Sequence, residues 1–237
     1  MNKEDLVSPS DIENYMKSFV GFGDQNAKIW VVGLEQGGGE NLAELRQRVS
    51  SWKAMGCSEF SDLVQYHESI GEFRWHGRKA KIQPTLGKAI RTILSSKGEE
   101  CTTDNVRRFQ SEVFGRTSSD TVIAELMPLP SKNVGEWIYS DLDGVHGVSS
   151  REEYVSEYQE VRVKLLQQKV LEASPKLVLF LGKSALDSWT KVVNGQFEEK
   201  DGALWYENRM TKFVVADHPT AFGVKNSYFE AIGRSCS

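Results

Sequence analysis

The sequence contains few cysteines and no long hydrophobic run. Its 237 residues include 3 cysteines, Cys57, Cys101 and Cys236. An odd number of cysteines at such wide spacing excludes a disulfide scaffold, a four-cysteine iron–sulfur site and a zinc ribbon. No apolar stretch approaches the roughly 20 residues that a membrane span needs, and the N-terminal residues do not resemble a secretory signal. We therefore expect a cytoplasmic protein that holds no metal or cofactor and contacts no membrane.

The sequence also lacks an excess of positive charge. It has 29 basic and 33 acidic residues, which give a formal net charge of −4. Nucleic acids and anionic membranes attract proteins with a positive field, so any contact with DNA has to come from a local basic patch. The length suits one large domain, and the sequence shows no internal repeat or linker. We expect residues 1–237 to form a single domain and the protein to be a monomer.

Four short apolar segments, rich in β-branched residues, predict buried strands. They are Ala27–Gly33, Thr121–Met127, Lys176–Gly182 and Lys212–Ala216. Helical patterns lie between them, over Leu86–Leu94, Arg151–Glu172 and Ser184–Val193, and another helix is expected before Gly21. Capping-box spacings at Ser10–Glu13 and Ser150–Glu153 indicate two helix starts. The alternation predicts an α/β protein of three layers, α/β/α, around a central, mainly parallel four-stranded sheet.

The loop after the first predicted strand carries a carboxylate and a run of glycines, Gly33-Leu34-Glu35-Gln36-Gly37-Gly38-Gly39. Ligands of parallel sheets bind beyond the carboxyl ends of the strands, so this loop should border the binding crevice. Consecutive glycines let a backbone approach a ligand and present its N–H groups, although a merely flexible turn would look the same. Glu35 is more informative, because a carboxylate in a loop at the edge of a binding crevice is a candidate for binding or catalysis. We interpret Glu35 as a functional residue.

The segment Gly182-Lys183-Ser184 follows another predicted strand and invites comparison with a phosphate-binding loop. That motif requires a glycine five residues before Gly182, where this sequence has Leu177. The match therefore fails. We interpret Gly182 as a tight turn into the next helix, with Lys183 near a phosphate and Ser184 as a helix cap.

A histidine follows the last predicted strand, in Asp217-His218-Pro219-Thr220-Ala221-Phe222. A lone histidine is more often structural than catalytic. Here Pro219 fixes the chain beside His218, and the apolar Phe222 stands in a loop that also contains Lys225. These neighbours favour a functional histidine that faces the crevice.

Together these segments resemble the uracil-DNA glycosylase superfamily, in the same order along most of the chain. Gly33-Leu34-Glu35-Gln36-Gly37 is similar to the first motif of the family, with Gln36 in place of the usual proline. Gln83-Pro84-Thr85-Leu86 resembles the family's Pro-Ser-Leu helix start, and Leu181-Gly182-Lys183-Ser184-Ala185 resembles its Leu-Gly-x-x-Ala turn. His218-Pro219-Thr220-Ala221-Phe222 is similar to the family's His-Pro-Ser-Pro-Leu loop and is the strongest of these matches.

The resemblance implies a monofunctional DNA N-glycosylase, which extrudes a base from the duplex and hydrolyses its bond to the sugar. It implies that Glu35 stabilises the cationic sugar and orients or deprotonates the attacking water. A neutral His218 would donate a hydrogen bond to the departing base, and Phe222 would fill the gap in the base stack. Thr220, Lys183 and Lys225 are expected to contact DNA.

The stretch Phe73-Arg74-Trp75-His76-Gly77-Arg78-Lys79 combines aromatic and basic residues. We interpret it as a loop that faces DNA, in which Trp75 stacks on a base. Arg74, Arg78, Lys79 and Lys81 would supply the local positive patch. Solvated charges on an ordinary surface loop explain the same pattern equally well.

Glu125 bears on the substrate, because it stands in Ile123-Ala124-Glu125-Leu126-Met127-Pro128 where the family has its base-reading asparagine. With Gln36 and Trp75, it is a candidate for base recognition. An ionised carboxylate accepts hydrogen bonds only, so it suits the amino group of cytosine and opposes O4 of uracil. A cytosine modified at C5 is consistent with this, and the match most resembles phage-defence members that remove glucosylated hydroxymethylcytosine. A buried, protonated Glu125 would instead act as a donor.

Three other functions stay open at this point. A repair glycosylase for uracil or deaminated bases would use the same residues. A nucleic-acid-binding module without activity would explain the departures at Gln36 and Glu125. A hydrolase of free nucleosides would use the crevice but would not need Phe222 or the basic loop.

Overall fold

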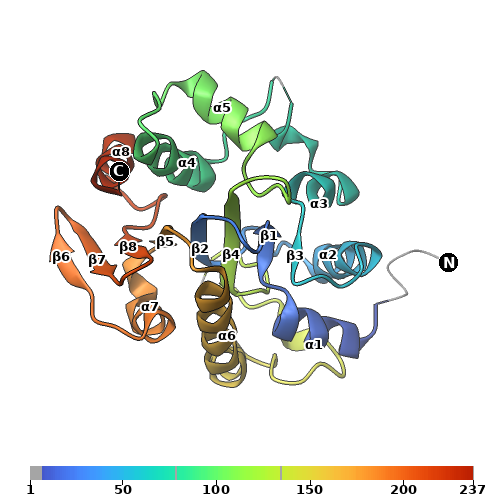
Figure 1. Ribbon diagram of the computed structural model, residues 1–237. Coiled ribbons are helices and arrows are strands. Elements are labelled where there is room, and N and C mark those ends of the chain that lie inside the picture. Colours follow the sequence, from blue (N-terminus) through green and yellow to red (C-terminus); the bar gives the residue numbers. More distant parts are fainter. Residues whose placement is uncertain (1–6, 78, 134, 237) are drawn as a thin grey trace.

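The computed structural model describes residues 7–77, 79–133 and 135–236, and its centre is a mixed sheet of eight strands (Figure 1). The strand order is β3-β1-β4-β2-β5-β8-β7-β6. The four predicted strands form the middle of this sheet as β4 (Thr121–Met127), β2 (Ile29–Glu35), β5 (Leu177–Leu181) and β8 (Lys212–Ala216), and they pair in parallel. Their apolar runs are buried on both faces, as expected for parallel strands.

The prediction of a four-stranded sheet is wrong in extent, because both edges carry further strands. β1 (Gly21–Gly23) pairs antiparallel with β4, and β3 (Phe60–Ser61) pairs with β1. At the other edge β7 (Ala203–Glu207) pairs antiparallel with β8, and β6 (Glu198–Lys200) with β7. β1 and β3 are very short, β6 is made of exposed charged residues, and β7, although five residues long, is mostly only partly buried, so none of the four shows the pattern of a buried strand.

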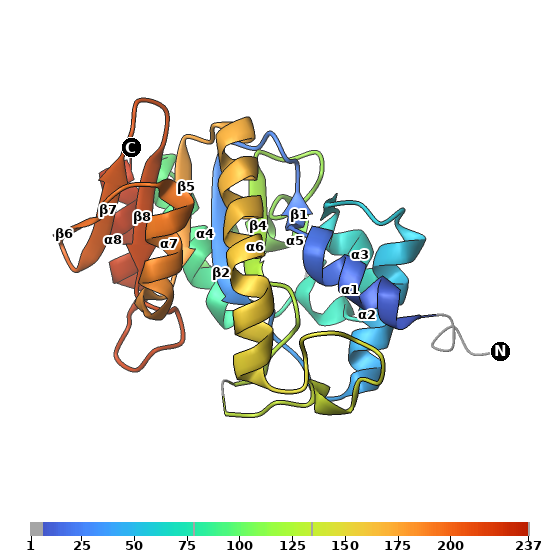
Figure 2. The same ribbon diagram turned by 90° about the horizontal axis from the view of Figure 1, so that it is seen from below.

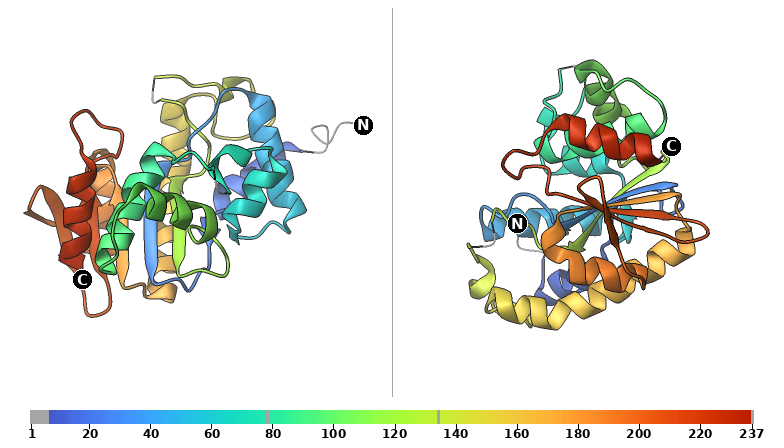
Figure 3. Two further views of the ribbon diagram at one scale, coloured as in Figure 1. Left: turned by 90° about the horizontal axis from the view of Figure 1, so that it is seen from above. Right: turned by 90° about the vertical axis from the view of Figure 1, so that its left-hand side faces the viewer.

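Helices cover both faces of the sheet and one of its ends. The helices are α1 (Pro9–Ser18), α2 (Leu42–Ala54), α3 (Leu63–Ser69), α4 (Pro84–Ser96), α5 (Thr103–Glu112), α6 (Arg151–Ala173), α7 (Leu186–Val193) and α8 (Asn226–Cys236). α4, α5 and α8 lie over one face, while α6 and α7 lie over the other (Figures 2 and 3). α2 and α3 lie beyond β1 and β3, at the opposite end from β8 (Figure 1). The expected α/β/α layering is confirmed.

The first helix begins two residues earlier than the sequence pattern suggests. Ser8 is the cap: its hydroxyl accepts from the Asp11 N–H at 3.2 Å, and the Asp11 carboxylate accepts from the Ser8 N–H at 2.8 Å. The predicted capping box at Ser10 and Glu13 is therefore wrong, because Pro9 already occupies the first helical position.

The predicted start of α6 at Ser150 is confirmed, since the Ser150 hydroxyl accepts from the Glu153 N–H at 3.1 Å. Among the described helices, none is long and apolar enough to cross a membrane. The three cysteines form no disulfide with one another.

Candidate functional site

A cleft of about 790 Å³ opens at the carboxyl ends of the parallel strands. It is lined by five residues predicted for catalysis or base recognition: Glu35, Gln36, Trp75, Glu125 and His218. These come from the ends of β2 and β4, from the 3₁₀ turn Phe73–Trp75, and from the loop after β8. The volume falls within the roughly 300–1,000 Å³ typical of ligand sites.

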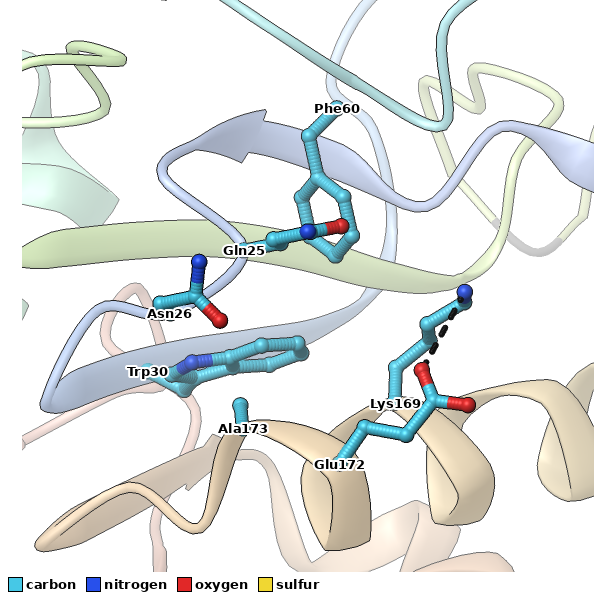
Figure 4. Close-up of a pocket in the computed structure, with 7 residues that line it drawn as sticks. All are labelled: Gln25, Asn26, Trp30, Phe60, Lys169, Glu172 and Ala173. Atoms are coloured by element: carbon cyan, nitrogen blue, oxygen red, sulfur yellow. Dashed lines mark hydrogen bonds and ion pairs between the residues drawn. The ribbon is translucent and has the colours of Figure 1, made fainter.

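A second, much smaller pocket lies near the amino end of β2 and holds about 50 Å³ (Figure 4). Trp30 and Phe60 form its apolar walls, and the Lys169 ammonium pairs with the Glu172 carboxylate at its side, 3.4 Å away. It lies at the opposite end of the sheet from the predicted site residues and is too small for a nucleobase. We assign it no function.

Glu125 lies on the floor of the large cleft, in the space that Gly33 leaves open. The register of β2 and β4 places Gly33 opposite Glu125. A Cβ atom on Gly33 would lie 2.2 Å from Oε2 of Glu125, far inside contact distance. The strand-ending glycine therefore serves to admit the Glu125 carboxyl group.

Oε2 of the Glu125 carboxyl group is enclosed and has no hydrogen-bond partner among the described residues, while the residue as a whole is partly exposed and lines the cleft. Burial, and then the nearby charge of Glu35, raise the pKa of Glu125 to about 8, against a smaller opposing effect of Arg162. The group is therefore mostly protonated at pH 7. Of the two alternatives left open by the sequence, the enclosure favours the one in which Glu125 both donates and accepts a hydrogen bond.

Glu35, at the end of β2, forms an ion pair with Arg151, the first residue of α6. Nη1 of Arg151 donates to Oε1 of Glu35 at 2.7 Å, and the two side chains are only 16% and 10% exposed. Nη2 of Arg151 donates to the Ser131 hydroxyl at 2.6 Å, and the guanidinium lies over the Trp137 ring. Oε2 of Glu35 carries no hydrogen bond among the described residues, so one carboxylate oxygen is left to face the cleft.

The side chain of Gln36 supports the loop from within. Its Oε1 accepts from Arg48 at 2.8 Å, and its Nε2 donates to the Tyr15 hydroxyl at 3.0 Å. Arg48 also donates to the Gly37 carbonyl and forms an ion pair with Glu44 at 2.7 Å. Gln36 lines the cleft as predicted, but its amide is already engaged by these partners, which leaves it little capacity to read a base.

The glycine loop is filled by protein atoms where the sequence suggested an open cradle. A Cβ atom on Gly38 would lie 2.3 Å from the Glu44 carboxylate, and one on Gly39 would lie 2.5 Å from the Pro130 carbonyl oxygen. The Gly39 N–H is also used, since it donates to Glu44 at 3.0 Å. Of the three glycines, Gly37 alone has open space around its Cα. The expectation of N–H groups directed at a ligand is thus wrong for Gly39.

His218 is fixed in a defined tautomer by Thr220. The Thr220 N–H donates to Nδ1 of His218 at 3.3 Å, and the Thr220 hydroxyl lies 3.0 Å from the same nitrogen. Partial burial, and then the charge of Lys88, lower the pKa of His218. A neutral imidazole that accepts at Nδ1 carries its proton on Nε2, so His218 can donate a hydrogen bond into the cleft. Thr220, predicted to contact DNA, orients this histidine.

The loop after β8 is held in place by two lysines. Lys88 of α4 donates to the carbonyl oxygens of Pro219 and Val224, the latter at 2.7 Å. Lys183, predicted to approach a phosphate, forms an ion pair with Asp217 at 3.0 Å and donates to the Gly202 carbonyl. Its ammonium is thus already partnered by protein groups.

Of the residues predicted to contact DNA, those that the structure describes lie outside the cleft, except Arg74 of the predicted basic patch, which lines it. Phe222 is fully exposed, Lys225 and Lys79 are exposed, and Arg78 lies outside the described residues. Trp75 lines the cleft with the Arg74 guanidinium stacked on its ring at 4.6 Å. Arg74 also pairs with Glu72 at 2.8 Å, which reduces the positive charge of the predicted patch.

Sequence reasoning missed four residues at this site: Arg48, His67, Lys88 and Arg151. A signal was present for Arg151. It stands in the first turn of α6, where the helix dipole disfavours a cation, so a buried anionic partner is expected. For the other three, the sequence pattern offers no comparable sign.

Among the described residues, no group of three or more histidine, cysteine, aspartate or glutamate side chains could hold a metal ion. No family model and no curated sequence matches the chain.

Proposed function

We propose that this protein is a DNA N-glycosylase that extrudes a non-standard base and hydrolyses its bond to the sugar, leaving an abasic site. One observation carries the proposal: a single cleft joins the Glu35 carboxylate, the neutral His218 imidazole and the enclosed Glu125 carboxyl group. Glu35 ends β2, Glu125 lies two residues before the end of β4, and His218 follows β8, so all three lie near the carboxyl ends of the parallel central strands. The sequence resemblance to uracil-DNA glycosylases implies a role for each of these three residues.

The reaction develops two opposite charges, and the cleft offers a partner for each. As the bond between C1′ and the base breaks, the sugar becomes cationic and the base anionic. Glu35 presents a carboxylate oxygen that can stabilise the sugar and orient the water whose oxygen attacks C1′. Nε2 of His218 donates to the base, and a hydrogen bond to a charged group contributes roughly 1.5–3 kcal/mol. That corresponds to about a tenfold to hundredfold gain in rate if it forms only in the transition state.

Glu125 supports recognition of the base edge through one donor and one acceptor. A protonated carboxyl group donates to N3 of cytosine and accepts from its amino group, and with the roles exchanged it pairs with N3–H and O4 of uracil. Glu125 therefore does not exclude uracil by itself. The cleft, at about 790 Å³, is large enough to admit a base that carries a bulky group.

We take a hypermodified cytosine, such as the glucosylated hydroxymethylcytosine of phage DNA, as the proposed substrate, and antiviral defence as the proposed role. Uracil repair is the alternative. Purified protein is incubated with matched duplexes that contain uracil, 5-hydroxymethylcytosine or glucosylated 5-hydroxymethylcytosine, and alkali-labile sites are counted.

Cleavage confined to the glucosylated base supports the proposal. Cleavage at uracil alone would keep the glycosylase and reject the substrate, and cleavage nowhere would favour a binding module. Glu35→Gln is expected to abolish cleavage. Glu198→Gln, on the exposed edge strand β6, is the matched control that should leave it unchanged.

A further inference from the structure

The cleft continues beyond Glu125, away from His218. The strand order places β8, which precedes His218, on one side of β2, and places β4, β1 and β3 on the other (Figure 1). The far wall is formed by α2 and α3, which contribute Gln47 and His67 to the lining, and by Ile70, which directly follows α3. A base whose bond to the sugar lies near Glu35 and His218 therefore has its outer edge, the edge farthest from that bond, directed toward this wall.

His67 in this wall is in direct contact with a second histidine, His76, which follows the 3₁₀ turn Phe73–Trp75 and does not itself line the cleft. Nδ1 of His67 lies 2.8 Å from Nε2 of His76, and the two rings are 5.0 Å apart between centroids. Two imidazole nitrogens at this distance share one proton, because two N–H groups would oppose each other. The pair therefore cannot hold both histidines in the charged form.

The surroundings keep both rings neutral. Burial, His76, Arg48 and Arg74 lower the pKa of His67 to about 3. Burial and Arg116 lower the pKa of His76, against the opposing carboxylates of Glu68 and Asp62.

The remaining nitrogens of the pair differ in their surroundings. Nδ1 of His76 is buried and has no hydrogen-bond partner among the described residues. A buried N–H without a partner is costly, so the proton of His76 belongs on Nε2, where it is donated to His67. His67 then accepts at Nδ1 and carries its own proton on Nε2. That nitrogen has no hydrogen-bond partner among the described residues, and His67 lines the cleft.

We propose that the His67–His76 pair forms a specificity subsite for an uncharged, hydroxyl-bearing substituent on the outer edge of the extruded base, with Nε2–H of His67 as the donor to its oxygen. Gln47 assists, since its amide nitrogen donates to the Ile70 carbonyl at 3.2 Å and its Oε1 is left to accept from the hydroxyl. The subsite rests on the proposed glycosylase function. It adds the residues that distinguish a substituted base from a plain one.

The test compares His67→Phe, which keeps a ring of similar shape, with His67→Gln, which keeps a donor. His146→Phe is the matched control, because His146 is exposed and contacts Glu157 outside the cleft. Each protein is tested on duplexes that differ only at C5 of one cytosine: methyl, hydroxymethyl, glucosylated hydroxymethyl or carboxyl. The readouts are kcat and KM for excision, and binding by the same variants in a Glu35→Gln background.

We expect His67→Phe to lower the preference for hydroxyl-bearing bases over the methyl base by roughly threefold to tenfold, the range for one uncharged hydrogen bond. His67→Gln should recover part of it, and His146→Phe should change nothing. An undiminished preference in His67→Phe overturns the subsite, as does excision that ignores the C5 group altogether. The binding measurement distinguishes failure of the subsite from failure of the glycosylase proposal. If no base is excised but binding still prefers hydroxyl-bearing bases in a His67-dependent way, the glycosylase reaction is rejected and the subsite is retained.

Discussion

The carboxyl group of Glu125 occupies the space that a side chain on Gly33 would fill. The two residues are register partners in β2 and β4, and a Cβ atom on Gly33 would lie 2.2 Å from Oε2 of Glu125. Gly33 belongs to the first motif of the sequence, and Glu125, at the predicted base-reading position, lies more than ninety residues later in the chain. A single methyl group added at Gly33 would therefore displace the Glu125 carboxyl group from the floor of the cleft.

Gly33→Ala is expected to destabilise the protein by about 1–3 kcal/mol, because an inserted methyl group forces a buried side chain from its place. Activity should fall further than stability explains, since the displaced group is Glu125. Gly37→Ala is the control, as no atom lies within 4 Å of its would-be Cβ. Urea unfolding measures both variants, and equal stabilities would contradict the packing described.

The protonated state of Glu125 predicts a pH dependence of stability. Its pKa is about 8 in the folded protein and near the ordinary 4.5 when unfolded. Between these values the folded state binds one proton more than the unfolded state, so this contribution is full below about pH 4.5 and is lost as pH rises toward 8. The loss approaches about 1.4 kcal/mol per pH unit inside that window.

Glu125→Gln removes the titration and keeps the shape of the side chain. The free energy of unfolding of the wild type relative to Glu125→Gln should fall steadily from pH 5 to pH 8. Denaturant unfolding at several pH values measures this difference, and a difference that is flat across the range would show that Glu125 is ionised in the folded protein.

The centre of the fold was predictable from sequence, whereas its edges were not. β2, β4, β5 and β8 are short apolar runs, and their length and β-branched residues favour buried strands over helices. β6 consists of exposed Glu198, Glu199 and Lys200, whose pairing with β7 depends on chain geometry and leaves no hydrophobic pattern. β1 and β3 are too short to show a pattern, and β7 is mostly only partly buried, so the four-stranded prediction missed all four edge strands.

The candidate site divides in the same way. Glu35, Glu125 and His218 lie at or near the carboxyl ends of central strands, so their convergence follows from the sheet topology. The Arg151–Glu35 contact joins residues 116 positions apart, and the His67–His76 pair depends on how a short helix meets a 3₁₀ turn. Neither contact has a periodic signature in the sequence.

Arg151→Gln is expected to lower kcat with little change in KM, because Arg151 orients Glu35 and does not itself face the substrate in this arrangement. Loss of the mostly buried pair should also reduce stability by about 1–3 kcal/mol. Arg151→Lys should recover part of both. The exposed Arg209 provides the control variant Arg209→Gln, and steady-state kinetics with unfolding curves measure all three. An unchanged kcat in Arg151→Gln would contradict the positioning role.

Phe222→Ala is expected to impair excision from duplex DNA without affecting stability, since the ring is fully exposed. A side chain that fills the gap left by an extruded base helps only where a stack exists, so excision from single strands should be unchanged. Met210→Ala, at another exposed apolar residue, serves as control. Equal losses on single-stranded and duplex substrates would rule out a role in filling the stack.

The most direct test of the glycosylase proposal is to measure the free base and the abasic site from the same incubation. Purified wild-type protein acts on duplex DNA that contains glucosylated 5-hydroxymethylcytosine, the released base is quantified by mass spectrometry, and abasic sites are counted in the recovered strand. One free modified base is expected per abasic site, with neither formed by Glu35→Gln. Recovery of intact DNA with no free base of any kind, or strand breaks without released base, would contradict it.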